Sequence, residues 1–193
     1  MNKEASLSKF NFINSYEDTK RAEAYARLEF AGTYQLAYRD LPDIIFNNVQ
    51  GKKAIDFGCG TGRSTRFLQK LGFNVIGIDI TGDMVKKAKE IDPKGDYRRI
   101  DDGNFNQFKK NYYDLVLSVF TFDNIPIRDK KVRILSKIRD LLNENGRIIN
   151  IVSAPEIYTN EWVSFSTKGF PEREACPQGN LSSCLNKGLH CRT

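Results

Sequence analysis

Three glycines alternate with other residues directly after an apolar run that holds a carboxylate. In AIDFGCGTGRS (54–64), Gly58, Gly60 and Gly62 closely follow Asp56. Glycine reaches positive φ without strain and has no Cβ to collide with a ligand lying on the turn. The helix expected next points unpaired N–H groups and its positive dipole end at the same place. The stretch therefore predicts a ligand site on a strand-to-helix turn.

The glycine spacing and the carboxylate favour one kind of ligand over another. Gly58-x-Gly60-x-Gly62 differs from the G-x-G-x-x-G spacing of dinucleotide sites, and no Gly-Lys-Ser/Thr ending of a phosphate loop follows. Asp56, expected at the mouth of the site, disfavours a pyrophosphate and suits a ligand that carries positive charge. Cys59 is interpreted as a small residue that fills a tight turn, with a reactive thiol as the alternative.

Acidic residues also follow the next two expected strands. Asp79 ends VIGID, where an acid can accept hydrogen bonds from ribose hydroxyls. Asp101 and Asp102 follow YRRI, where a carboxylate could bind an exocyclic amine and a backbone N–H could meet a ring nitrogen. Either aspartate could instead cap the segment after the strand, and Asp101 is the preferred ligand. A ribose and an amino-bearing base are expected.

Strand-like and helix-like segments alternate through the middle of the chain. The expected strands are 52–57, 74–80, 97–101, 112–120 and 147–154, and the expected helices are 61–72, 82–92 and 129–146. Strands that are apolar on both faces predict an α/β fold, a doubly wound, mainly parallel sheet with helices on both faces. Residues 12–50 also have helical patterns. The last long helix should cover the sheet with Val132, Leu135, Ile138 and Leu142, widened by Ile134 and Leu141.

Composition limits the class of protein. The 193 residues carry a formal charge of +6, but the basic residues are scattered among acids, which argues against a nucleic-acid partner. The densest basic stretches, 128–131 and 136–140, lie on a helical pattern and are interpreted as a solvated face. Without an export signal or a membrane-spanning apolar run, a cytoplasmic protein is expected. No metal site is predicted, because Cys176, Cys184, His190 and Cys191 match no zinc spacing.

In this order, the motifs resemble those of the class I S-adenosylmethionine-dependent methyltransferases. AIDFGCGTGRS resembles the first motif of that family, GIDIT its second acidic motif, IDD its adenine motif, and YYDLVLSVF its fourth strand with the following loop. The resemblance covers about residues 50–153. It implies a Rossmann-like fold and S-adenosyl-L-methionine as the cofactor.

The resemblance also implies a role for each matched residue. The glycines would pack against the methionine and ribose, Asp79 would hold the ribose hydroxyls, and Asp101 the adenine amine. Asp56 would meet the amino group directly or through water. Met84 would cover the adenine or belong to the core. The implied cofactor-binding residues are Tyr25, Asp56, Gly58, Cys59, Gly60, Gly62, Asp79, Ile80, Met84, Asp101, Asp102, Ser118, Val119 and Phe120.

The methyl acceptor is less clearly indicated. Transfer from a sulfonium is an in-line displacement, and it needs a base only if the nucleophile arrives protonated. Asp123 in FTFDNIP is the candidate catalytic residue. Phe120, Phe122, Tyr25 and Tyr34 are candidates to surround the methyl group, with core packing as the alternative. A small-molecule acceptor is expected, and a homo-oligomer is left open.

The expected organisation has three parts: a helical lid segment at 1–50, the cofactor-binding domain at 51–165 and an irregular tail at 166–193. The sheet of the family normally ends in an antiparallel hairpin, but only WVSFST (162–167) is offered here, so these strands are expected to be incomplete or absent. One alternative function is therefore a cofactor-binding but catalytically incomplete protein or subunit. RNA methylation is a third hypothesis.

Overall fold

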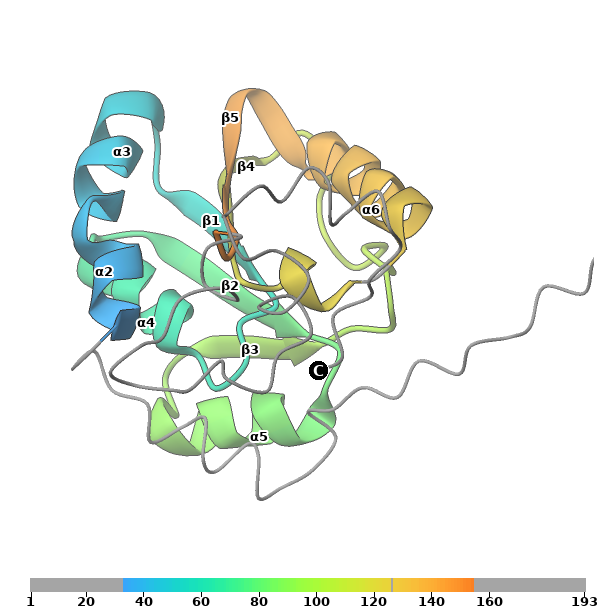
Figure 1. Cartoon of the computed structure of the whole chain (residues 1–193), viewed down its shortest axis with the longest axis horizontal. Coiled ribbons are helices and arrows are strands. Elements are labelled where there is room, and N and C mark those ends of the chain that lie inside the picture. Colours follow the sequence, from blue (N-terminus) through green and yellow to red (C-terminus); the bar gives the residue numbers. More distant parts are fainter. Residues whose placement is uncertain (1–32, 126, 155–193) are drawn as a thin grey trace, which may run out of the picture.

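One five-stranded sheet forms the centre of the molecule (Figure 1). The structure, a computed structural model, describes residues 33–125 and 127–154. The strand order is β3-β2-β1-β4-β5, and every neighbouring pair is parallel. The predicted parallel sheet is confirmed. Its strands are β1 (Lys53–Phe57), β2 (Asn74–Asp79), β3 (Asp96–Arg99), β4 (Tyr113–Val119) and β5 (Leu142–Ile151).

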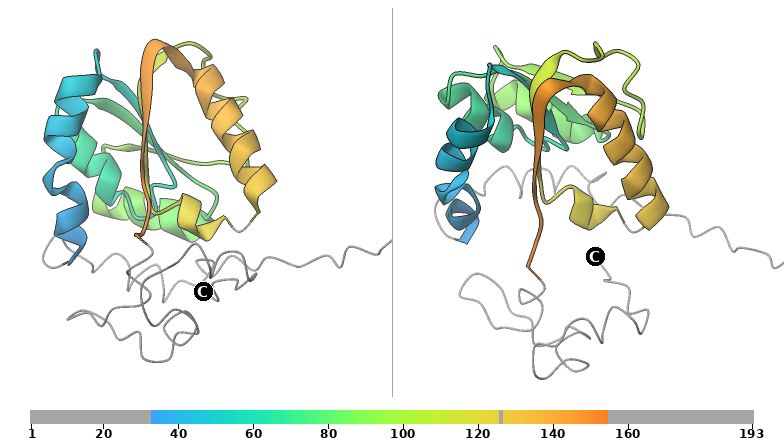
Figure 2. Two further views of the ribbon diagram at one scale, coloured as in Figure 1. Left: turned by 45° about the horizontal axis from the view of Figure 1, so that its top comes forward. Right: turned by 90° about the horizontal axis from the view of Figure 1, so that it is seen from above.

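Helices cover both faces of this sheet, as expected (Figure 2). Helices α2, α3 and α4 lie on one side and α6 lies on the other. Helix α5 packs beside β2 and β3. The helical elements are α2 (Thr33–Arg39), α3 (Leu41–Asn48), α4 (Arg63–Lys70), α5 (Gly82–Ile91), the short 3-10 helix η1 (Phe122–Asn124) and α6 (Arg128–Leu141).

The strand register divides the core into two layers. Ala54 pairs with Val75 and Leu115, and all three side chains join the buried cluster beneath α2, α3 and α4. The next residue of β1, Ile55, points to the opposite face and joins the cluster beneath α6. Both faces of β1 are therefore apolar because side chains alternate along the strand and each face is covered.

The described part of the N-terminal segment belongs to the core. Tyr38, Leu41 and Ile45 are buried against the sheet, and the Tyr38 ring meets that of Phe67 edge-on at 5.0 Å. The helical prediction for residues 33–48 is confirmed. Residues 1–32, with Tyr25, and residues 155–193, with WVSFST and the three late cysteines, lie outside the described residues.

Helix α6 differs from the prediction in its end and in its buried face. It stops at Leu141 instead of continuing to Gly146, and residues 142–146 begin β5. Its buried residues are Ile134, Ile138 and Leu141, whereas Val132 is 57% exposed and Leu135 is 40% exposed. At 100° per residue, a helix that buries the first set must turn the other two away.

Pairing with β4 explains why the helix ends early. Leu142 pairs with Tyr113 in extended conformation and packs against the core from the strand. Gly146 does not close a helix. A Cβ there would lie 2.8 Å from the carbonyl oxygen of Tyr113, so the close approach of the two strands requires glycine. In the described ranges, no helix is long and apolar enough to cross a membrane.

Candidate functional site

The glycine loop lies at the carboxyl ends of β1 and β2, beside the point where the strand order reverses. The backbone N–H groups of Gly58 and Cys59 both donate to the carbonyl oxygen of Ile78, at 2.8 and 3.0 Å. Gly58, Gly60 and Gly62 all have positive φ, at +73°, +52° and +83°. The loop is thus fastened to the second strand while it turns into α4.

Two of the three glycines are required by the protein's own side chains. A Cβ at Gly58 would collide with Thr121, whose hydroxyl donates to the carbonyl oxygen of Phe57 at 3.0 Å. A Cβ at Gly62 would lie 2.6–2.8 Å from three atoms of the buried Tyr97 ring. The fold excludes side chains at these two positions before any ligand is considered. The sequence gives no sign of either contact.

Asp79 ties the loop to the end of β2. Its Oδ2 accepts a hydrogen bond from the N–H of Gly60 at 2.9 Å, and its Oδ1 accepts one from the N–H of Thr81 at 2.8 Å. Burial raises the pKa of Asp79, and these backbone donors oppose that rise. The Thr81 side chain and the N–H of Ile80 also oppose the rise, so the carboxylate is held by several groups of the loop and the strand end.

Asp56 lies beneath the loop, not at the mouth of the site as expected. It pairs with Gly77 and Leu117, and this register turns its side chain toward α4. There Oδ2 accepts hydrogen bonds from the hydroxyls of Ser64 and Thr65, at 2.7 and 2.6 Å. The residue is fully buried, and its Oδ1 has no hydrogen-bond partner. A ligand on the surface of the loop does not reach it directly in this conformation.

Burial raises the pKa of Asp56 from 3.8 to about 6, against the two hydroxyl donors and with a further contribution from the charge of Asp79. Because the folded pKa exceeds the unfolded one, the folded state binds more protons between these values and loses stability as pH rises through that window. This loss of stability is absent below pH 4. It is complete above about pH 6, where it lowers the free energy of unfolding by about 3 kcal/mol.

We expect Asp56→Asn to remove this pH dependence. The free energy of unfolding of the variant, relative to the natural protein, should rise between pH 4 and pH 6 and then stay level. Losing an acceptor for Ser64 or Thr65 lowers stability equally at every pH. Only the variation with pH of the difference between variant and natural protein therefore reports on the pKa of Asp56. Urea unfolding at several pH values measures it. A constant difference would contradict the raised pKa of Asp56.

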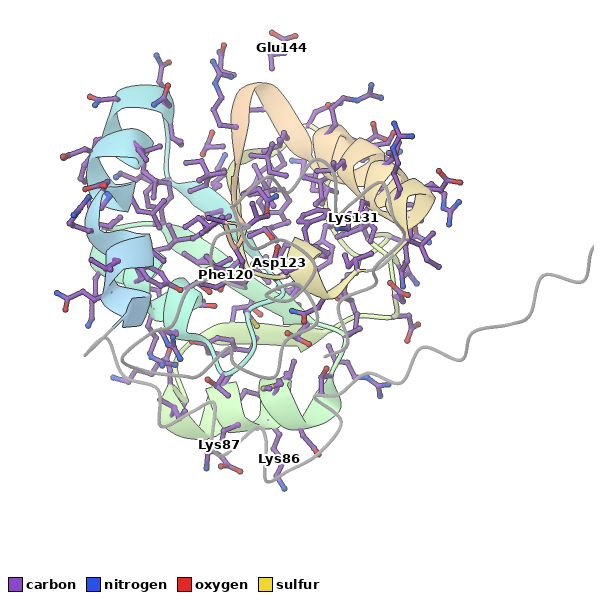
Figure 3. The ribbon with its side chains drawn as sticks, in the orientation of Figure 1. Lys86, Lys87, Phe120, Asp123, Lys131 and Glu144 are labelled. Carbon is purple, nitrogen blue, oxygen red and sulfur yellow. The ribbon has the colours of Figure 1, made fainter. Side chains whose placement is uncertain are left out.

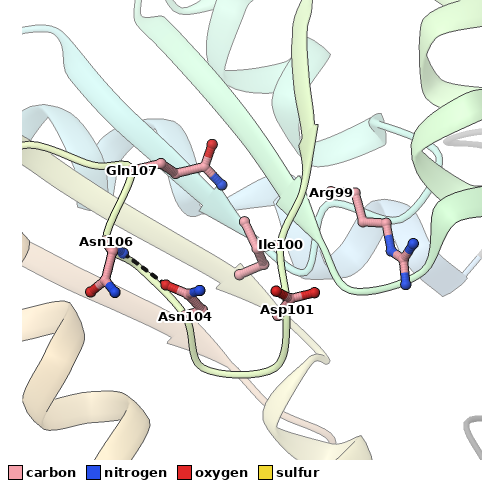
Figure 4. A pocket seen from close by; sticks show the side chains of 6 residues that line it. All are labelled: Arg99, Ile100, Asp101, Asn104, Asn106 and Gln107. Atoms are coloured by element: carbon pink, nitrogen blue, oxygen red, sulfur yellow. Dashed lines mark hydrogen bonds between the residues drawn. The ribbon is translucent and has the colours of Figure 1, made fainter.

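Asp101 lines a pocket of about 310 Å³ formed by the turn after β3 (Figure 4). Its backbone carbonyl accepts the N–H of Asn104 at 2.9 Å, and the Asn104 side chain accepts the N–H of Asn106 at 3.1 Å. Asp102 lines a different pocket, where it pairs with Lys130. Only Asp101 is thus placed with amide side chains that could read a base. The amides of Asn104, Asn106 and Gln107 were not identified from sequence.

The end of β4 contains a strained residue. Phe120 has φ +59°, a left-handed conformation that costs a non-glycine residue about 1–3 kcal/mol and is common at functional sites. Its N–H donates to the carbonyl oxygen of Ile151 at 2.8 Å, and its carbonyl accepts the side-chain amide of Asn124 at 3.0 Å. Neighbouring Ser118 is buried, and its hydroxyl has no partner. The strained Phe120 and the unpaired hydroxyl of Ser118 thus lie in the segment that the family resemblance predicts to line the cofactor pocket.

Asp123 lies close to Phe120 in the connection after β4 (Figure 3). Its Oδ2 accepts hydrogen bonds from the N–H and the hydroxyl of Ser153, at 2.9 and 2.8 Å. The carboxylate is exposed and holds the chain just beyond β5. Its catalytic role stays a prediction, and these bonds show that it also has a structural one.

Other predicted site residues are buried. Phe122 packs on the ring of Phe57 at 5.6 Å and belongs to the core, which favours the packing alternative. Met84 is also buried. Cys59 is buried, and burial raises the pKa of its thiol well above the ordinary value, so it stays protonated. The small-residue interpretation of Cys59 fits this environment. Ile80 and Val119 are half-buried near the site.

Comparisons with known proteins agree with this architecture. A family model described as a methyltransferase domain matches residues 55–150, about half of the chain. An uncharacterized methyltransferase of Bacillus cereus is 29% identical over 165 residues, which cover 83% of this chain and 74% of that protein. One from Bacillus cytotoxicus is 30% identical over 139 residues, 72% of this chain, and the chain spans only 62% of its length.

A solved structure shows the same fold. The crystal structure of an S-adenosylmethionine-dependent methyltransferase from Clostridium acetobutylicum has a TM-score of 0.59 and is 19% identical. The likeness covers 73% of this chain and 59% of that one.

The residues of the site fit S-adenosylmethionine. Asp79 places a carboxylate beside Gly60 at the end of β2, where ribose hydroxyls can donate to it, and Asp101 lines a pocket one strand further along. Beneath them, the unpaired Oδ1 of Asp56 adds negative potential that suits a cationic ligand. The family match, the relatives, the fold and these residues lead to one assignment: the chain belongs to the class I S-adenosylmethionine-dependent methyltransferases, with S-adenosylmethionine as its cofactor.

Proposed function

We propose that this protein transfers a methyl group from S-adenosylmethionine to a small-molecule acceptor by in-line displacement. The observation that carries the proposal is the link from Asp79 to Gly60, which fixes an acidic acceptor against the glycine loop at the strand ends. The cofactor supplies an activated methyl group on a sulfonium when it is bound. The main tasks of the protein are then to align the reactants and to exclude water.

Each part of the site has a distinct task in this proposal. The carboxylate of Asp79 accepts hydrogen bonds from the ribose hydroxyls, and Asp101 binds the adenine amine. Residues 118–120 line the methionine portion at the end of β4, where the φ of +59° at Phe120 turns the chain sharply. Asp123, fixed by Ser153, orients the acceptor or accepts its proton.

A small acceptor is favoured by the charge distribution. The net charge of +6 is modest for 193 residues, and most basic residues are scattered among acids along the chain. RNA methylation would instead call for an extended basic surface. The alternative of a catalytically incomplete subunit rests on β5, which pairs only with β4 among the described strands.

We expect the pure chain to form S-adenosylhomocysteine only when an acceptor is supplied. The test adds S-adenosylmethionine together with either the low-molecular-mass or the RNA fraction of a cell extract. Product formation with the first fraction alone supports a small acceptor. Product formation only with RNA would overturn that acceptor class, and cofactor binding without turnover in either would favour the incomplete subunit.

Two variants separate catalysis by Asp123 from its structural role. Asp123→Asn should lower kcat by about 100-fold if the carboxylate takes a proton from the acceptor. Ser153→Ala removes one hydrogen bond to the same carboxylate but leaves its charge. This control should therefore keep most of the activity. Equal losses in both variants would assign Asp123 to structure alone.

A further inference from the structure

A second pocket lies between the turn after β3 and α6. It has a volume of about 300 Å³ and is lined by Asp102, Gly103, Lys130, Arg133, Ile134 and Lys137. Three of these six residues are cationic and come from one helix. The spacing of three and four residues between Lys130, Arg133 and Lys137 places them on the same face of α6. The sequence predicted a solvated surface for the basic face of this helix. Arg133 and Lys137 are exposed as predicted, and all three cations also line the pocket.

Two of the cations are already held by the protein. Lys130 forms an ion pair with Asp102, and the ammonium of Lys137 donates to the carbonyl oxygen of Gly103 at 2.7 Å. Gly103 has φ +67°, and this conformation belongs to the turn that presents its carbonyl to α6. Both ammonium groups are thus fixed at the rim, which lowers the entropy lost when a ligand binds.

Arg133 differs from these two lysines. Across the described residues, its side chain makes no hydrogen bond or ion pair, and it is exposed. Its guanidinium offers five N–H donors in a planar fork that suits bidentate contact with an oxyanion. Ile134, next in the chain, is 3% exposed and anchors this part of α6 in the core.

The charges in the pocket match a phosphate group. Three positive side chains and one carboxylate leave a formal charge of +2. A phosphate monoester carries between −1.5 and −2 near neutral pH and offers three strong acceptor oxygens. A carboxylate would neutralise only half of this charge. We propose that α6 and the turn after β3 form a binding site for the phosphate group of a small phosphorylated molecule.

The grouping of the cations favours a small molecule over a nucleic acid. Nucleic-acid surfaces spread their cations along a stripe that follows the backbone, whereas here three cations converge on one pocket beside the fixed carboxylate of Asp102. The site is also separate from the Asp101 pocket, because the two pockets share no lining residue. The proposal therefore does not depend on the methyl-transfer function.

The test titrates inorganic phosphate into the 193-residue chain at low ionic strength and follows the backbone amide of Gly103 by NMR. We expect saturable binding in the millimolar range. Arg133→Gln should weaken it about tenfold, because one charge-assisted bidentate contact is lost. The matched control is Arg139→Gln, which removes the same charge from the opposite side of α6, and it should leave binding unchanged.

Three results would overturn the proposal. The first is no saturable shift at Gly103, and the second is equal weakening in Arg133→Gln and Arg139→Gln, which would indicate diffuse charge instead of a site. The third is a short RNA that binds far more tightly than phosphate, with a steep salt dependence that both variants reduce. That last result would assign the surface to a nucleic acid.

Discussion

Asp79→Ala is expected to weaken S-adenosylmethionine binding by about 100-fold, the loss of two hydrogen bonds to a charged acceptor. The same substitution also leaves the N–H groups of Gly60 and Thr81 without their acceptors, because each donates a hydrogen bond to one oxygen of Asp79. Asp79 thus serves the ligand and the shape of the loop together. Calorimetry measures the affinity, and Asp96→Ala, which removes a carboxylate at the amino end of β3, should leave it unchanged.

Loss of loop shape and loss of the ribose contact can be separated with a second ligand. The natural protein should bind S-adenosylhomocysteine much more tightly than an analogue that lacks both ribose hydroxyls. Asp79→Ala should bind the two equally, because the missing carboxylate is the group that distinguishes them. If the variant still discriminates between the two ligands, Asp79 does not hold the ribose and acts only on the loop.

The charge of Asp79 also links this variant to the titration of Asp56. Asp79 contributes to the raised pKa of Asp56 through like-charge repulsion. In Asp79→Asn the pKa of Asp56 should therefore fall below about 6. The loss of unfolding free energy that accompanies ionisation of Asp56 should then end at a lower pH.

The sequence predicted the order of elements well because the signals were local. Continuous apolar runs marked β1, β2 and β4, and the alternating glycines marked the turn between β1 and α4. The predicted end of α6 was wrong because Leu142 locally favours a helix, whereas the structure places it in a strand. Its pairing with Tyr113 decides between them, and a contact that distant leaves no local pattern.

The details of the site depended on register and on distant side chains. Asp56 lies in a run that is apolar on both sides, so the sequence could not show that its side chain faces α4. The φ of Phe120 and the contacts of Thr121 and Tyr97 with the glycines are equally invisible in one sequence. The residue types of the site were predictable, but the directions of its side chains were not.

Gly62→Ala is expected to destabilise the protein by about 4 kcal/mol. Comparison with Gly72→Ala separates the part due to backbone strain from the part due to the collision with Tyr97. The two glycines have nearly the same φ, +83° and +82°, so each substitution carries the same backbone strain of about 1–2 kcal/mol. A Cβ at Gly72 meets nothing within 4 Å, whereas one at Gly62 meets the Tyr97 ring. The difference between the two variants is therefore the cost of displacing that ring.

The Tyr97 ring cannot move freely, which makes this cost large. It is 2% exposed, its hydroxyl donates to Asp92 at 3.0 Å, and it also lies against Gly77. Overpacking at such a position costs about 1–3 kcal/mol. Tyr97→Val alone is destabilising, but Gly62→Ala added to it should cost no more than Gly72→Ala does in the natural protein. If Gly62→Ala remains as costly without the ring, the requirement for glycine arises elsewhere in the loop.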